Sequence, residues 1–112
     1  MKKRIKIAIP TDDGLIVRQK FAGSRAFVVA TVKAGMIVHQ ELRWNLLSEI
    51  LTSGHGFFYN LVDCDVIIIN EIGNSHRDLF KVRKKEIVHT DHTKISKALD
   101  SMLEKNKLVQ FA

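Results

Sequence analysis

The run "DVIII" at residues 65–69 is the feature that most constrains the fold of this chain of 112 residues. Its four consecutive β-branched apolar residues suit a strand, and because no polar residues alternate with them, both faces of that strand are expected to be covered. A strand of this kind requires packing layers on both sides. The run therefore predicts a layered α/β domain.

Four other segments have the pattern of strands. In "RIKIAI", residues 4–9, isoleucine alternates with other residues, which predicts a strand with one strongly apolar face. Residues 26–32 and 36–42 are expected to form two further strands, and the short turn "KAG" between them predicts a hairpin. "EIVH" at 86–89 predicts a short fifth strand.

Helices are expected over residues 56–62, 75–83 and 93–104. The last carries apolar residues at spacing i, i+3, i+4, i+7 and i+8, which is the strongest helical pattern in the chain. The order is therefore strand, hairpin, helix, strand, helix, strand, helix. We expect one domain over residues 1–112, an α/β fold with a mixed sheet.

The formal net charge of +6 and the isoelectric point of about 9.7 favour an anionic partner. Charge alone does not distinguish nucleic acid, a phosphorylated metabolite, an anionic cofactor and an acidic protein. The single cysteine, Cys64, cannot form an intramolecular disulfide, and no run is long enough to span a bilayer. We expect a cytoplasmic protein with no membrane partner.

The order of these segments resembles that of a known family. "MKKRIKIAIPTDDG", a loop containing Phe and Gly, the hairpin, "HG" at 55–56, "DVIIINEIG" at 65–73 and a terminal helix are together similar to the dinitrogenase iron-molybdenum cofactor biosynthesis family, of the NifX and NifB C-terminal type. The resemblance implies a ribonuclease-H-like three-layer domain with three helices and a five-stranded sheet of order 3-2-1-4-5, in which the second strand is antiparallel.

The resemblance also implies a function. Members of this family bind the iron-molybdenum cofactor or a related iron-sulphur cluster precursor rather than catalyse a reaction. A nitrogenase-type protein or another cluster-accepting protein would then be the partner.

With that topology, the segments after the four parallel strands meet at one end of the sheet, where open α/β sheets bind ligands. Four of the five histidines lie in these segments, and imidazole is a common ligand of transition metals: His55, His76, His89 and His92. We take His55 and His76 as the candidate metal ligands. Cys64 precedes the fourth strand, at the opposite end of the sheet, and is expected to be a buried apolar side chain.

The segment "NEIGNSHRD", residues 70–78, supplies a second candidate feature. Gly73 is expected to allow a tight turn, and Ser75 with Asp78 matches a helix capping box. The free N–H groups at the start of that helix attract anions. Gly73, Asn74 and Ser75 are therefore candidate ligand-binding residues.

The segment "VRQKFAGSRAF", residues 17–27, combines three cations with small residues, and it has Lys20-Phe21-Ala22-Gly23 where the resembled family has a His-Phe-Gly stretch. A protonated lysine does not coordinate a metal, but it is a good counter-charge for an anion. We interpret Arg18, Lys20 and Arg25, together with Phe21, as an electrostatic clamp for an anionic ligand. Any metal coordination is left to His55 or His76.

Two alternatives remain open. A module that binds a phosphorylated or other anionic metabolite, or an acidic partner, would need only the basic loop and the helix start. A two-metal nuclease could use carboxylates after the strands, at Asp12, Asp13, Glu71 and Asp91. However, nucleases with this sheet carry a carboxylate within the first strand, which this chain lacks, and Asp12-Asp13-Gly14 fits a turn. We therefore do not expect nucleic acid as the ligand.

Overall fold

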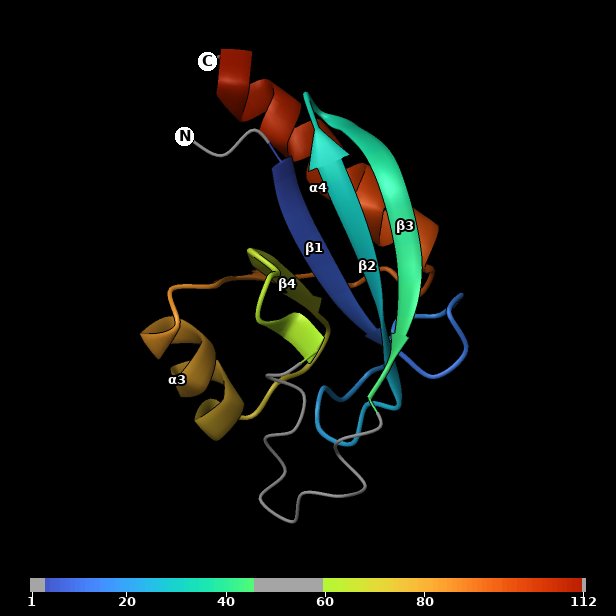
Figure 1. The fold of residues 1–112 in the computed structure, drawn as a ribbon, viewed down its shortest axis with the longest axis vertical. Coiled ribbons are helices and arrows are strands. Elements are labelled where there is room, and N and C mark those ends of the chain that lie inside the picture. Colours follow the sequence, from blue (N-terminus) through green and yellow to red (C-terminus); the bar gives the residue numbers. More distant parts are fainter. Residues whose placement is uncertain (1–3, 46–59, 112) are drawn as a thin grey trace.

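The computed structural model describes residues 4–45 and 60–111, with side chains as far as Glu104. Two helices and five strands lie in these ranges: β1 (Arg4–Thr11), β2 (Ala26–Lys33), β3 (Met36–Trp44), β4 (Val66–Ile69), α3 (Asn74–Val82), β5 (Glu86–His89) and α4 (Ile95–Phe111). The five strands form one sheet in the order β3-β2-β1-β4-β5 (Figure 1).

The pairing of the strands confirms the expected mixed sheet. β2 is antiparallel to both β1 and β3, whereas β4 is parallel to β1 and β5 is parallel to β4. β1, β3, β4 and β5 therefore all run in one direction, and the segments that follow them emerge at the same end of the sheet. We call this end the carboxyl end.

The run that predicted a doubly covered strand is buried as expected. All four residues of β4 are buried, and they alternate between two apolar clusters. Val66 and Ile68 belong to the cluster that contains the apolar side of α4, whereas Ile67 and Ile69 pack in the cluster that contains Phe80 of α3. Helices thus cover both faces of the sheet, and Figure 1 shows α4 crossing β1, β2 and β3.

The hairpin between β2 and β3 forms at the predicted turn. Ala34 and Gly35 both have positive φ, 53° and 77°, as the tight two-residue turns of hairpins require. β1 and β3 each extend two residues beyond the expected ends, to Thr11 and Trp44.

The helices agree with the prediction in part. α3 and α4 occupy the second and third expected positions, and α4 continues to Phe111 rather than ending at residue 104. Of the first expected helix, residues 56–59 lie outside the described residues, while Asn60 and Leu61 are helical. None of the helices in the described ranges is long and apolar enough to cross a membrane.

Candidate functional site

The loop after β1 lies at the carboxyl end of the sheet, and its first turn is organised by two side chains. The Asp13 carboxylate accepts the N–H groups of Leu15 at 2.8 Å and Ile16 at 3.0 Å. These bonds, that of Ile16 first, lower the pKa of Asp13. The buried Thr11 hydroxyl donates to the Ile16 carbonyl at 2.7 Å and accepts the N–H of Gly14 at 2.9 Å. The predicted turn at residues 12–14 is therefore present.

The same loop is fastened to its surroundings by backbone hydrogen bonds. The Val17 N–H donates to the carbonyl of Thr93 at 2.7 Å, and the Ile95 N–H at the start of α4 donates to the carbonyl of Leu15 at 3.0 Å. Farther along, the Phe21 N–H donates to the carbonyl of Glu71, just after β4, at 2.9 Å. The loop thus spans from the start of α4 to the segment that leads into α3.

Arg18 holds this loop together from within. Its guanidinium donates to both carboxylate oxygens of Asp12 at 2.8 and 2.9 Å, to the Lys20 carbonyl at 2.9 Å and to the Ala22 carbonyl at 3.3 Å. The Asp12 carboxylate balances its charge. The side chain predicted as part of the clamp therefore has an internal structural role in this structure.

Gly23 lies against this guanidinium with a φ of 78°, and a Cβ added there would be 3.2 Å from the Arg18 Nη2 atom. Replacing Gly23 with alanine is expected to lower the free energy of unfolding by about 1–2 kcal/mol, because the positive φ is strained for alanine and Arg18 must move. Urea denaturation measures the change. Alanine at Gly73, where φ is −75° and the added Cβ meets nothing within 4 Å, is the matched control; its loss should be smaller, about 0.5 kcal/mol, because alanine is a poorer N-cap than glycine.

Phe21 anchors the loop to the core. Its side chain is 2% exposed, and its ring centroid lies 5.4 Å from that of Phe80, 5.8 Å from that of Phe27 and 5.5 Å from the ring of His76. Phe21, predicted as part of the clamp, therefore packs in the core in this structure. The same packing places the predicted metal ligand His76 directly beside the loop.

Lys20 and Arg25 are the cations of the loop that remain available. Both are exposed, and neither side chain forms a hydrogen bond or ion pair with a residue in the described ranges. The backbone of Lys20 pairs with that of Glu71. Lys20 thus lies beside Glu71, in the segment that leads into α3. That segment continues into the predicted residues Gly73, Asn74 and Ser75.

The start of α3 differs from the sequence-based expectation. The N-cap is Gly73 and no side chain caps the helix, so the predicted capping box of Ser75 and Asp78 is wrong. Ser75 is instead the second residue of the helix. Gly73 has extended backbone with an ordinary φ of −75°, so its expected role in a tight turn is also wrong. Asn74 and Ser75 are exposed, in the turn whose N–H groups have no acceptor within the helix.

The histidines are spread along the carboxyl end of the sheet. His89 ends β5, with its Nε2 atom 3.5 Å from Asp91, and the N–H of His92 donates to the Thr90 hydroxyl at 3.2 Å. His55 lies outside the described residues. Within the described part of the chain, no three His, Cys, Asp or Glu side chains are grouped so that they could hold a metal ion.

Cys64 is buried, as expected. Its side chain is 1% exposed, and burial raises the pKa of its thiol to about 12. A protonated thiol in this position is a poor metal ligand. It also lies before β4, at the end of the sheet opposite the loop.

A hollow of about 480 Å³ lies in the loop and is lined by residues 12–13 and 16–20. Its charged side chains balance, because Asp12 and Asp13 accompany Arg18 and Lys20. Both aspartates are also engaged, one by Arg18 and the other by backbone N–H groups. Two of the four carboxylates considered for a nuclease, Asp12 and Asp13, are thus used to shape the loop.

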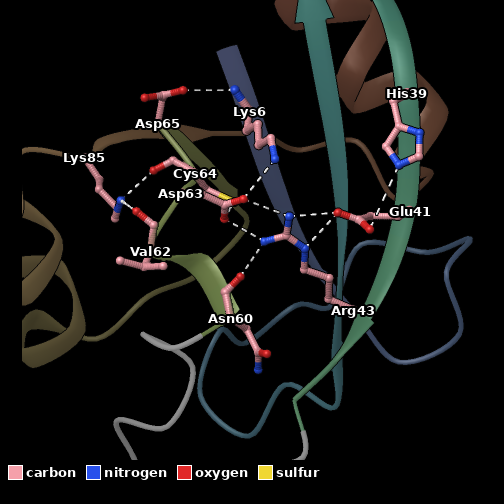
Figure 2. A network of polar contacts seen from close by, with 10 residues as sticks. All are labelled: Lys6, His39, Glu41, Arg43, Asn60, Val62, Asp63, Cys64, Asp65 and Lys85. Carbon is pink, nitrogen blue, oxygen red and sulfur yellow. Dashed lines mark hydrogen bonds and ion pairs between the residues drawn. The ribbon is translucent and has the colours of Figure 1, made fainter. Parts of the chain in front are cut away.

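A network of polar contacts that no sequence pattern predicts centres on Arg43 of β3. Figure 2 shows its guanidinium between two carboxylates. It bonds both oxygens of Asp63 at 2.7 and 3.0 Å, Glu41 at 2.7 and 2.9 Å, and the carbonyl of Asn60 at 2.7 Å. Lys6 of β1 also donates to Asp63, at 2.9 Å. This network ties the edge of the sheet to the segment before β4.

The fold and this loop together define a class: an α/β domain that presents a backbone-fastened loop at the carboxyl end of a mixed sheet. The family model described as "Dinitrogenase iron-molybdenum cofactor" matches residues 3–105. The chain therefore belongs to that family. A search of curated protein sequences finds no match to this chain.

Solved structures with low sequence identity share the fold. A protein of Methanocaldococcus jannaschii described provisionally as a dinitrogenase is 19% identical, with a TM-score of 0.73 over 94% of this chain and 92% of that one. A Thermotoga protein described provisionally as NifB is 19% identical, with a TM-score of 0.70 over 89% and 88%. The apo form of the orange protein from Desulfovibrio gigas is 22% identical, with a TM-score of 0.66 over 94% and 90%.

Proposed function

We propose that this chain is a non-catalytic binding protein for an anionic metallocluster, either the iron-molybdenum cofactor or an iron-sulphur cluster precursor. Family membership over residues 3–105 carries the proposal. The cluster is cargo, received from or delivered to a nitrogenase-type or other cluster-accepting protein in the cytoplasm. We also propose that the domain has a ribonuclease-H-like fold.

The cargo would lie between the loop and the start of α3. Lys20 supplies a positive charge there that no residue in the described ranges pairs with, and the Phe21 N–H bond to Glu71 fixes the distance between the two segments. The first turn of α3, at Asn74 and Ser75, adds N–H groups directed toward anions. Arg25 supplies a second exposed cation in the loop.

Coordination would come from histidine. His76 lies beside the loop through its ring contact with Phe21, and His55 is the other candidate ligand. Coordination requires the neutral imidazole. Two histidine donors do not make up a full set of ligands, so the cluster would be held largely by charge. Binding should therefore weaken at high salt.

Reconstitution under anaerobic conditions tests the proposal. The protein is incubated with iron and sulphide, or with isolated iron-molybdenum cofactor, desalted, and measured by absorbance and metal analysis. Retained metal is expected, and it should fall in the variants His76→Ala and His55→Ala. The absence of retained metal in the wild-type chain under all of these conditions would overturn the proposal.

Lys20→Gln is expected to weaken cluster binding about 3- to 10-fold, because one charge-assisted contact is lost. The matched control is Lys97→Gln, which removes the same charge from an exposed position on α4. Titration monitored by absorbance measures both. Equal affinities for the two variants would exclude Lys20 from the site.

A second candidate function is the binding of a free oxyanion. One observation favours it: the described residues gather no three metal-ligating side chains. The expectation from the resemblance, that Lys20 stands in place of a histidine, agrees with it. Calorimetric titration with inorganic phosphate and with molybdate distinguishes the two functions. Binding that depends on Lys20 but not on His76 would favour the oxyanion, whereas the opposite dependence favours the cluster.

A nuclease is the remaining alternative. Asp12 and Asp13 are occupied by Arg18 and by backbone N–H groups, so neither is placed as a free metal ligand. We therefore expect no cleavage of RNA or DNA with magnesium or manganese.

A further inference from the structure

β3 is the outer strand at one edge of the sheet, and it exposes apolar side chains along its length. Trp44 is 53% exposed and Leu42 is 39% exposed. A long edge strand with exposed apolar residues presents unpaired backbone groups and invites pairing with another strand.

The bulge in β3 limits where such pairing can occur. The register between β2 and β3 shifts between Thr31 and Val32, so that Val38 has no partner in β2. Such a bulge disrupts the ladder and bends an edge strand. The regular part of the edge therefore runs from His39 to Trp44.

The backbone groups that point outward can be assigned from one hydrogen bond. The Asn45 N–H donates inward, to the Arg25 carbonyl, at 2.7 Å. Alternate residues of a strand turn their backbone groups to opposite edges. Gln40, Leu42 and Trp44 therefore present their N–H and C=O groups to the free edge.

The side chains in this part of the strand alternate between the two faces. Gln40, Leu42 and Trp44 lie opposite Ala30, Val28 and Ala26 of β2, on the face that α4 covers. Glu41 and Arg43 lie on the other face, opposite Val29 and Phe27.

We infer that the edge of β3 pairs antiparallel with β3 of a second copy of this chain, with the two-fold axis at Leu42. In this register Leu42 faces Leu42 of the partner subunit, and Gln40 faces the partner's Trp44. Glu41 faces the partner's Arg43, so that no like charges lie directly opposite each other on the second face, and each guanidinium keeps its bonds to Glu41 and Asp63 of its own chain. The dimer is isologous and closed, and its sheet is continuous across ten strands.

Like charges and the bulge at Val38 exclude the neighbouring registers. Moving the axis to Glu41 or to Arg43 places like charges directly opposite each other, which is destabilising. Moving it to Gln40 makes the bulged Val38 face Leu42. The axis at Leu42 uses the regular part of the edge and brings the exposed apolar side chains of the two copies together. The alternating charges of Glu41 and Arg43 and the exposed Leu42 between them make this edge complementary to itself, which favours a second copy over an unrelated strand.

The turn after β1 extends the apolar contact. A Cβ added at Gly14 would lie 3.7 Å from Leu42, so this turn lies over Leu42, and its Leu15 is 71% exposed. The interface is nevertheless small compared with those of stable dimers, and we expect a dissociation constant in the micromolar range or weaker.

Sedimentation equilibrium from roughly 1 µM to 1 mM measures the association. A monomer–dimer equilibrium is expected, with a blue shift of the emission of Trp44, the single tryptophan, as concentration rises. Leu42→Lys should raise the dissociation constant tenfold or more, because two lysines then meet on the axis. Val38→Lys, at the bulge, is the matched control and should dimerise nearly as the wild type does. A chain that is monomeric throughout overturns the inference.

Cysteine cross-linking tests the register independently of stability. Leu42→Cys should form a disulfide-linked dimer under mild oxidation, since directly opposite residues are about 5.5 Å apart between Cα atoms. Gln40→Cys and Trp44→Cys should each fail alone, because like positions are then roughly 14 Å apart, and should cross-link when mixed. The wild type, with only buried Cys64, should not cross-link. Cross-linking of Gln40→Cys alone, or none with Leu42→Cys, overturns the register.

Discussion

Replacing Phe21 with alanine is expected to lower the free energy of unfolding by about 3–5 kcal/mol. The side chain is almost fully buried, and its ring contacts Phe27, Phe80 and His76. Alanine leaves a cavity and also removes aromatic contacts, each of about 0.5–1.5 kcal/mol. Urea denaturation followed by circular dichroism measures the loss.

The variant should also release the loop. Trypsin cleaves after Lys20 and Arg25, which flank Phe21, and cleavage there should become faster under native conditions once the anchor is gone. Leu99→Ala is the matched control, since it removes a buried side chain of α4 from the other apolar cluster and leaves the ring contacts of Phe21 in place. If the free energy of unfolding of Phe21→Ala lies within 1 kcal/mol of that of the wild type and cleavage in the loop is unchanged, Phe21 is not the anchor of the loop.

Asp63→Asn is expected to lower the free energy of unfolding at pH 7 by about 1–2 kcal/mol, a value reduced because the Asp63 side chain is 42% exposed and solvent screens its pairs. Hydrogen bonds from Arg43, and then from Lys6, hold the pKa of Asp63 well below its usual value. The unfolded chain therefore takes up the proton first as the pH falls. The stabilisation is complete above the unfolded pKa of about 3.9 and is lost as the pH falls toward the folded pKa.

Thermal or urea unfolding between pH 7 and pH 2 checks this dependence. The difference between the wild type and Asp63→Asn should be constant above about pH 5 and should shrink below about pH 4. Asp100→Asn, which changes an exposed carboxylate of α4, is the control and should follow the wild type. A difference that grows as the pH falls would contradict the assigned direction of the Asp63 pKa.

The fold could be predicted from the sequence because its determinants are local or periodic. The four β-branched residues of β4 specify a strand buried on both faces, and the positive φ angles of Ala34 and Gly35 occur where the short turn required them. The order of the strands came from the family resemblance. Turn residues identify β2 and β3 as neighbours, but neither they nor periodicity determine how this hairpin pairs with the other strands.

The site was less predictable because the sequence shows charged side chains but not the groups that they bind in the folded chain. Arg18 was expected to face a ligand, yet Asp12, six residues earlier, and two carbonyls of its own loop engage it. The Arg43–Asp63 pair joins residues twenty positions apart, and no sequence pattern marks such a pair. The capping-box pattern at Ser75 failed because the N-cap is Gly73, two residues before Ser75.

The bonds that fasten the loop after β1 run mainly through backbone atoms: Val17 to Thr93, Leu15 to Ile95 and Phe21 to Glu71. The path of the chain is therefore independent of the side chain at residue 20, which extends into solvent from a fixed frame. A histidine or a lysine can occupy this position without rebuilding the loop. A substitution at this position therefore alters the charge that the loop presents to solvent while the fold stays the same.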